Sequence, residues 1–183
     1  GVLRVWDPAG CELTTCGHAG GPPWVDADIS RDGRRVVGIR ESEDGTTPDL
    51  LVTPAGGACH LTRLTGHFGN VGSAVFDDAG DRVLSFGNND NTARIWNAGS
   101  GALLATLTHP DEVLSASFSV DGRALAVAVA DGGIYRWTAS GHLIGRPLEL
   151  PVEPGQLPVL ATAARLSPDG KRMAAASSDG HIY

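Results

Sequence analysis

Thiols and imidazoles gather in two short stretches of the sequence, and these side chains could bind a metal ion or act as nucleophiles. Cys11 and Cys16 precede His18, and Cys59 precedes His60. Their spacing matches no common zinc motif, and no third group stands where it would orient a Cys–His pair for attack. We therefore expect no metal ion, no cofactor and no catalytic residue, and we interpret the cysteines as small thiols, buried or half exposed.

Other motifs and the composition argue against further classes of protein. The sequence has no Gly-x-Ser-x-Gly elbow, no phosphate-binding loop and no His-Glu-x-x-His, so we expect no enzyme. The net charge of -7 argues against nucleic-acid binding, which needs clustered positive charge. No apolar run approaches the roughly 20 residues of a membrane-spanning helix, and we expect no signal peptide. Three cysteines are too few for a disulfide framework, which predicts a reducing, cytoplasmic location.

A repeat of about 45 residues organises the chain. One landmark is a strand position that is occupied in turn by Trp6, Val52, Trp96 and Trp137. A second landmark is a turn that ends in glycine, at Gly33, Gly80, Gly122 and Gly170. Two independent landmarks with one spacing predict a tandem array of similar units. Their approximate boundaries are 1–18, 19–67, 68–109, 110–158 and 159–183.

Each unit has the pattern of four short strands joined by tight turns. The strands predicted in one unit are 71–76, 82–86, 92–96 and 103–107. Their connections are rich in Gly, Asn, Asp or Ser, as hairpin turns require. Residues 124–130 are apolar throughout, so both faces of that strand must be covered. The pattern favours an all-β array of four-stranded antiparallel propeller blades over a two-sheet sandwich.

Three short motifs recur at fixed places in the units. They are a Gly-His pair that opens a unit, an Asp six residues before a Trp, and a Trp-Asp dipeptide. They stand at Gly17-His18, Gly66-His67, Asp90 with Trp96, Asp131 with Trp137, and Trp6-Asp7. On these motifs the sequence resembles the WD-repeat (Trp-Asp repeat) β-propeller family over essentially the whole chain.

The resemblance implies a buried polar network in each well-formed unit. A buried imidazole, carboxylate and indole N–H must bond to one another, because each costs free energy when it is left without a partner. The network residues that the motifs imply are His67, Ser85, Asp90 and Trp96, with Asp131 and Trp137 in the next unit. We also expect His18 to be a core hydrogen-bonding group and Trp6 to be buried.

The resemblance also bears on how much of a propeller the chain contains. Propellers of this family most often close with about seven or eight blades, so about four periods imply a partial or half propeller. We expect the chain to be a fragment of a longer polypeptide whose remaining blades cover its end faces. Closure into a four-bladed ring, and a ring made of two copies, are the alternatives.

One rim of the propeller carries acidic and aromatic side chains. In the resembled family, the loops before the first strands and those between the second and third strands lie on the same rim. These loops hold Trp24, Glu41, Glu43, Asp44, Phe68, Asn70, Asn89, Asp111 and Glu112. Such a rim could dock a basic protein or peptide. The alternatives are a solvated loop face and, for Trp24, packing over the neighbouring blade.

We therefore expect a non-enzymatic scaffold for protein–protein interaction, within a larger multidomain bacterial regulatory protein involved in signalling. The alternative is a propeller whose axial channel holds a small molecule or metal, as a ligand-binding or hydrolytic site. That site would need polar ligands where the first strands begin. Those positions hold Val71, Val113 and Val159, which argues against it.

Overall fold

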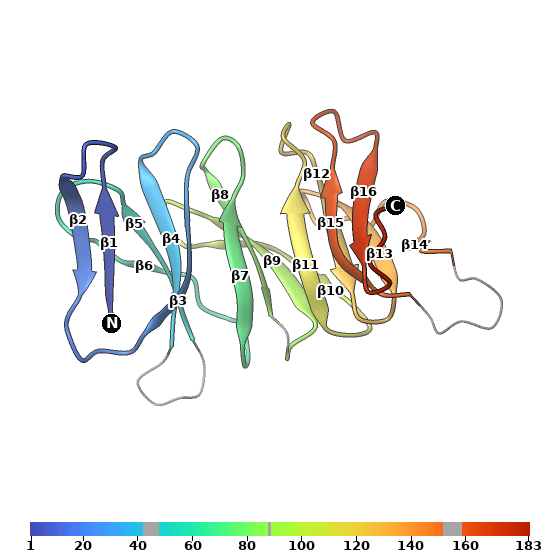
Figure 1. Cartoon of the computed structure of the whole chain (residues 1–183), viewed down its shortest axis with the longest axis horizontal. Coiled ribbons are helices and arrows are strands. Elements are labelled where there is room, and N and C mark those ends of the chain that lie inside the picture. Colours follow the sequence, from blue (N-terminus) through green and yellow to red (C-terminus); the bar gives the residue numbers. More distant parts are fainter. Residues whose placement is uncertain (42–47, 88, 152–158) are drawn as a thin grey trace.

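The described part of the chain is all β. A computed structural model describes residues 1–41, 48–87, 89–151 and 159–183, which contain sixteen strands and no helix. In these ranges no helix has the length and hydropathy that crossing a bilayer requires. The strands form five sheets, which follow one another in chain order from the N-terminal to the C-terminal end of the molecule (Figure 1).

Three of the sheets have four strands each, and the first and last sheets have two. The first sheet is β1 (Val2–Trp6) with β2 (Glu12–Gly17), and the last is β15 (Ala161–Leu166) with β16 (Met173–Ser177). The second sheet contains β3 (Trp24–Ile29), β4 (Arg35–Arg40), β5 (Asp49–Pro54) and β6 (Thr62–Arg63). The third contains β7 (Val71–Phe76), β8 (Arg82–Gly87), β9 (Thr92–Asn97) and β10 (Leu103–Thr108). The fourth contains β11 (Val113–Phe118), β12 (Ala124–Val129), β13 (Gly133–Thr138) and β14 (Leu148–Glu149).

Each sheet lies in one of the five expected units, whose exact boundaries stay a prediction. Neighbouring strands pair antiparallel, and the four strands expected in residues 71–107 are confirmed as β7 to β10.

The turn between the first and second strands has the same form in successive sheets. The amide of Gly80 donates to the carbonyl of Asp77 (3.0 Å), and the Asp77 carboxylate accepts from the amides of Asp81 and Arg82. Gly80 has a φ of 74°, a left-handed conformation that is unfavourable for residues with a Cβ atom. Glycines with positive φ stand at the corresponding places Gly33, Gly122 and Gly170. The glycine landmarks of the repeat are therefore the turns that reverse the chain.

Apolar side chains fill the space between consecutive sheets. Trp96 of β9 is fully buried in a cluster with Val37 and Ile39 of β4. Strand β12 is fully buried over residues 125–129, because other sheets cover both of its faces. Five stacked sheets confirm the blade prediction and exclude a two-sheet sandwich.

Arginines of the second strands tie the second sheet to a turn of the third and the third sheet to a turn of the fourth. Arg35 Nη1 donates to the carbonyl oxygen of Gly80 (2.7 Å), and Arg82 Nη2 donates to that of Gly122 (2.6 Å). Such charge-assisted hydrogen bonds have a defined direction, whereas apolar packing has none. They therefore fix how one sheet is placed against the next.

The strand register corrects one position of the repeat. Val83 pairs with Trp96 in the third sheet, and the corresponding Val36 pairs with Thr53 in the second. Thr53, and not Val52, therefore holds the place of the tryptophan. A shift of one residue turns a side chain to the other face of the sheet, and Val52 is accordingly buried in the cluster that contains Trp96.

A second correction concerns where the first strands begin. Val71 and Val113 begin β7 and β11 and are buried, as expected. Strand β15, however, begins at Ala161, which pairs with Ser177 as Val113 pairs with Val129. Val159 therefore lies two residues before the strand, and the assignment of Val159 was wrong.

Candidate functional site

A buried polar network joins the second and third strands of the third sheet to the segment before its first strand. His67 Nδ1 lies 2.8 Å from Asp90 Oδ2, and His67 Nε2 lies 2.7 Å from Ser85 Oγ. Trp96 Nε1 donates to the same Ser85 oxygen over 2.8 Å. The structure thus brings together the four side chains that the motifs imply.

The charges of the network follow from its burial. Burial lowers the pKa of His67, although the hydrogen bond to Asp90 opposes this. Burial alone would raise the pKa of Asp90, but hydrogen bonds from His67, the Thr92 hydroxyl and the Phe68 amide outweigh it and lower this pKa. A neutral imidazole with its proton on Nδ1 donates to the carboxylate, and Nε2 accepts from the Ser85 hydroxyl.

The same connectivity, Ser to His to Asp, occurs in the catalytic triads of hydrolases. Whether Ser85 could act as a nucleophile therefore depends on whether a substrate can reach its hydroxyl. Ser85 is 0% exposed, and its oxygen already contacts both the imidazole and the indole N–H. No face of this hydroxyl is open to a substrate carbonyl. The network can hold strands and loops together, but it cannot act as a nucleophilic site.

The next sheet contains a different network. Trp137 Nε1 donates to His109 Nε2 (3.1 Å), while Asp131 accepts a hydrogen bond from the Tyr135 hydroxyl (2.5 Å). Asp131 and Trp137 therefore belong to two separate pairs. Thr108-His109 stands where the motif has Gly-His, but His109 was not among the expected network residues, because Thr108 replaces the glycine. The signal that could have found it was a histidine at the position of His67.

Burial lowers the pKa of His109 to about 4. Nε2 accepts the indole proton, so the remaining proton of the neutral ring is on Nδ1. Within the described ranges Nδ1 has no hydrogen-bond partner. His109 is thus a buried histidine that the fold keeps neutral.

Among the described residues of the first two units there is no such network. His18 is exposed, and its Nδ1 lies 3.1 Å from the carbonyl oxygen of its neighbour Ala19, so its expected role as a core group was wrong. Trp6 is 55% exposed, because its neighbour Val5 packs toward the second sheet and side chains alternate along a strand, so Trp6 lies on the other face; the expectation of burial was wrong here too. A tryptophan at this position of the repeat is therefore not buried in every unit.

Three of the expected rim residues lie together beside the network of the third sheet. Phe68 is 74% exposed, while its backbone amide donates to Asp90 (3.2 Å). The amide of Asn70 donates to the side-chain oxygen of Asn89 (3.1 Å). Phe68 is therefore an exposed aromatic ring on a loop that is anchored at both ends.

The acidic residues expected on the rim stand at the same ends of neighbouring sheets. Glu41 is exposed directly after β4, and Asp111 and Glu112 directly precede β11. No ion pair involves these three carboxylates among the described residues. Glu43 and Asp44 lie outside the described residues.

Trp24 is placed differently from the other rim residues. Its ring lies so close to Gly38 that a Cβ added there would be 2.7 Å from the ring. The guanidinium of Arg40 lies 5.8 Å from the ring centroid, and the indole nitrogen is buried without a hydrogen-bond partner in the described chain. The ring packs on its own sheet, and its nitrogen also lies near Gly17 of β2 in the first sheet, so it is not a projecting anchor.

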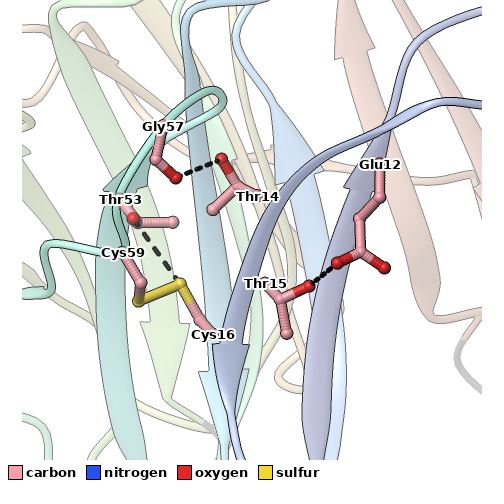
Figure 2. Close-up of a disulfide and its surroundings, with 7 residues drawn as sticks. All are labelled: Glu12, Thr14, Thr15, Cys16, Thr53, Gly57 and Cys59. Atoms are coloured by element: carbon pink, nitrogen blue, oxygen red, sulfur yellow. Dashed lines mark hydrogen bonds between the residues drawn. A yellow bond between two sulfur atoms is a disulfide. The ribbon is translucent and has the colours of Figure 1, made fainter.

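The cysteines differ from the expected free thiols. Cys16 and Cys59 form a disulfide, with Cα atoms 5.4 Å apart, and only Cys11 is a free thiol, which is exposed (Figure 2). The expectation was wrong because the segment between β5 and β6 returns to β2, which the spacing alone did not reveal. In the described residues no three His, Cys, Asp or Glu side chains form a cluster that could hold a metal ion.

The family is recognised by its repeat and by individual relatives. The family described as "WD domain, G-beta repeat" matches residues 58–97, 101–138 and 155–183, more than half of the chain. The chain is 39% identical over 74 residues to the coronin-like protein of Saccharomyces cerevisiae, which covers 40% of this chain and 11% of the relative. It is 30% identical over 121 residues to the SIR4-interacting protein SIF2 of the same yeast, over 66% of this chain and 21% of the relative.

A third relative is Coronin-7 of Mus musculus, 31% identical over 123 residues, which cover 67% of this chain and 12% of the relative. The chain thus spans about a fifth or less of the length of these relatives. The repeats and the relatives support a protein-interaction scaffold. Together with the stacked four-stranded sheets, they show that the chain belongs to the WD-repeat family and forms blades of a WD40 β-propeller.

Proposed function

We propose that the chain is a non-enzymatic scaffold that docks a basic peptide segment on the loop edge around Phe68. We call this surface the Phe68 edge and define it by Phe68, Asn70, Asn89, Asp111 and Glu112. The observation that carries the proposal is the exposed Phe68 ring on a backbone that Asp90 holds in place. Rigid aromatic rings are the usual anchors of protein interfaces, because little side-chain entropy is lost on binding.

The distribution of charge between the two edges supports a basic partner. At the opposite edge, which carries the glycine turns, acids are paired with arginines: Asp78 with Arg31, and Asp77 with Arg82. At the Phe68 edge the carboxylates of Asp111 and Glu112 have no such partner in the described part of the chain. Unpaired negative charge attracts a basic segment and speeds its encounter.

Burial of the polar network supports the absence of enzymatic activity, because Ser85 is closed to substrates. We further propose that the chain works in the cytoplasm as part of a larger multidomain regulatory protein. The small share of each relative that the chain spans supports the presence of further segments.

The test measures binding of a fluorescent Lys/Arg-rich peptide by anisotropy. The Phe68→Ala variant is expected to bind about tenfold more weakly, as the loss of an aromatic anchor does. Its melting temperature should stay the same, because the ring is 74% exposed. The matched control is Val120→Ala, which removes an exposed apolar side chain from the opposite edge. Equal affinity of the two variants, or no binding by the native chain, would refute the proposal.

A further inference from the structure

The junction between the first and second sheets lacks the residues that form the buried network elsewhere. Gly38 holds the place of Ser85, since each pairs with the matching alanine of the first strand, Ala27 or Ala74. Thr53 holds the place of Trp96. With a hydrogen atom and a small hydroxyl at these places, the hydrogen bonds of the network cannot form here, and the ring of Trp24 lies against Gly38 instead.

A disulfide occupies this junction instead. Cys16 Sγ lies 3.7 Å from Oγ1 of Thr53, and Cys59 joins it from the segment between β5 and β6 (Figure 2). Cys16 is 1% exposed, and Cys59 is half-buried. The covalent bond therefore links β2 to the second sheet beside the residue that replaces the tryptophan.

Other contacts also connect these two sheets in the described part of the chain: the Thr14 hydroxyl donates to the carbonyl of Gly57 (3.3 Å), and the Trp24 indole nitrogen lies near Gly17. The apolar cluster at the junction holds the small buried residues Val5, Val36 and Ala55, with Leu3 at its margin. The amide of Gly57 donates to the carbonyl of Leu13 (3.1 Å). The clusters between the second and third sheets and between the third and fourth sheets are larger and include aromatic rings, whereas the cluster between the fourth and fifth sheets contains none. The covalent bond thus adds to a junction that a small apolar cluster and a few hydrogen bonds also hold together.

We propose that Cys16 and Cys59 form a reversible thiol-modification site, at which oxidation locks the β1–β2 pair onto the second sheet and reduction releases it. In oxidation, both thiols give up a proton and together two electrons to a small disulfide such as oxidised glutathione, which leaves as two thiols. In reduction, a thiolate attacks the half-buried Cys59 sulfur and Cys16 departs as the leaving thiolate. A second thiolate then resolves the mixed disulfide.

The site responds to the redox state of its surroundings because the bond can be reached at Cys59. In a reducing compartment thiols are the resting state, and disulfides that form there are commonly transient and regulatory. The exposed Cys11 is five positions from Cys16 in the chain, about 16–18 Å along an extended segment, so it does not compete for the bond. Cys11 is therefore a matched control.

The experiment follows the native chain in oxidised and in dithiothreitol-reduced form. Peptide mapping by mass spectrometry should find the Cys16–Cys59 linkage in the first form and free thiols in the second. Reduction should lower the melting temperature by roughly 5–10 °C. Hydrogen exchange should accelerate in residues 2–17, while β7 to β13 stay protected.

Variants separate the bond from other effects of the reductant. Cys59→Ser should resemble the reduced protein and lose its response to dithiothreitol, whereas Cys11→Ser should respond as the native chain does. The proposal is overturned if the linkage is absent after oxidation, or if it stays closed in the folded protein under dithiothreitol. It is also overturned if the two forms of the native chain melt and exchange alike, a comparison that requires no variant to fold.

Discussion

Acidification should destabilise this protein through His109, and the structure sets the size of the effect. The folded-state pKa of His109 is about 4, against 6.5 for an unperturbed histidine, with burial as the main cause. The unfolded chain therefore binds the proton first as the pH falls. The free energy of unfolding decreases from about pH 6.5 downward and stops changing through this group below about pH 4.

The difference between the two pKa values gives the magnitude. One pKa unit corresponds to about 1.4 kcal/mol, so the full effect approaches about 3 kcal/mol. At pH 5 the linkage relation gives a loss of about 2 kcal/mol, since the unfolded state is then almost fully protonated and the folded state is not. That is a considerable share of the 5–15 kcal/mol that stabilises a typical protein.

The assay is urea unfolding of the native chain and of His109→Gln between pH 7.5 and pH 4.5. The glutamine amide oxygen can accept the Trp137 indole proton but does not titrate. Because His67 is present in both proteins, the difference between their pH profiles isolates His109. The native chain should lose about 2 kcal/mol more than the variant between pH 7 and pH 5. Parallel profiles would refute the assignment of a buried, neutral His109.

Two further substitutions test the packing. Ser85→Ala leaves the Trp96 indole N–H and the His67 imidazole without their shared partner, so the free energy of unfolding should fall by about 2–4 kcal/mol in urea denaturation; a change below about 0.5 kcal/mol would contradict the network. Gly38→Ala places a Cβ 2.7 Å from the Trp24 ring, so it should cost about 1–3 kcal/mol and shift the tryptophan emission, and an unchanged spectrum would show that the ring is not packed there.

The fold could be predicted because the same strand and turn patterns recur in successive units of the chain. The glycine turns and the apolar run of β12 depend on local chemistry, namely backbone conformation and two-sided burial. Both the turns and the buried strand can therefore be recognised from the types and spacing of the residues in the sequence. The strands of the third unit were accordingly predicted to within one residue.

The degenerate second unit was harder to predict. Without a tryptophan, the alignment placed Val52 at the landmark, whereas the strand register places Thr53 there. Both residues favour strands, so nothing in their types distinguishes the two faces of β5. Only the pairing with Val36 decides which side chain faces the first sheet.

The disulfide escaped prediction because it depends on where a loop returns in space. Cys16 and Cys59 are 43 positions apart, close to one repeat period, so they come into register on neighbouring sheets. Whether two such thiols meet depends on the path of the segment after β5, which no local pattern encodes.

The exposed Phe68 and the buried network are physically one unit. Asp90 accepts hydrogen bonds from both the His67 imidazole and the Phe68 amide, so the carboxylate that completes the core also fixes the loop. Because these hydrogen bonds lower the pKa of Asp90, the carboxylate keeps its charge in mild acid, where surface carboxylates begin to lose theirs. The loop that carries Phe68 thus keeps its conformation to a lower pH than a loop held by an exposed carboxylate would. A scaffold that presents an aromatic ring to a partner needs this combination, since an exposed ring on an unanchored loop would lose conformational entropy on binding.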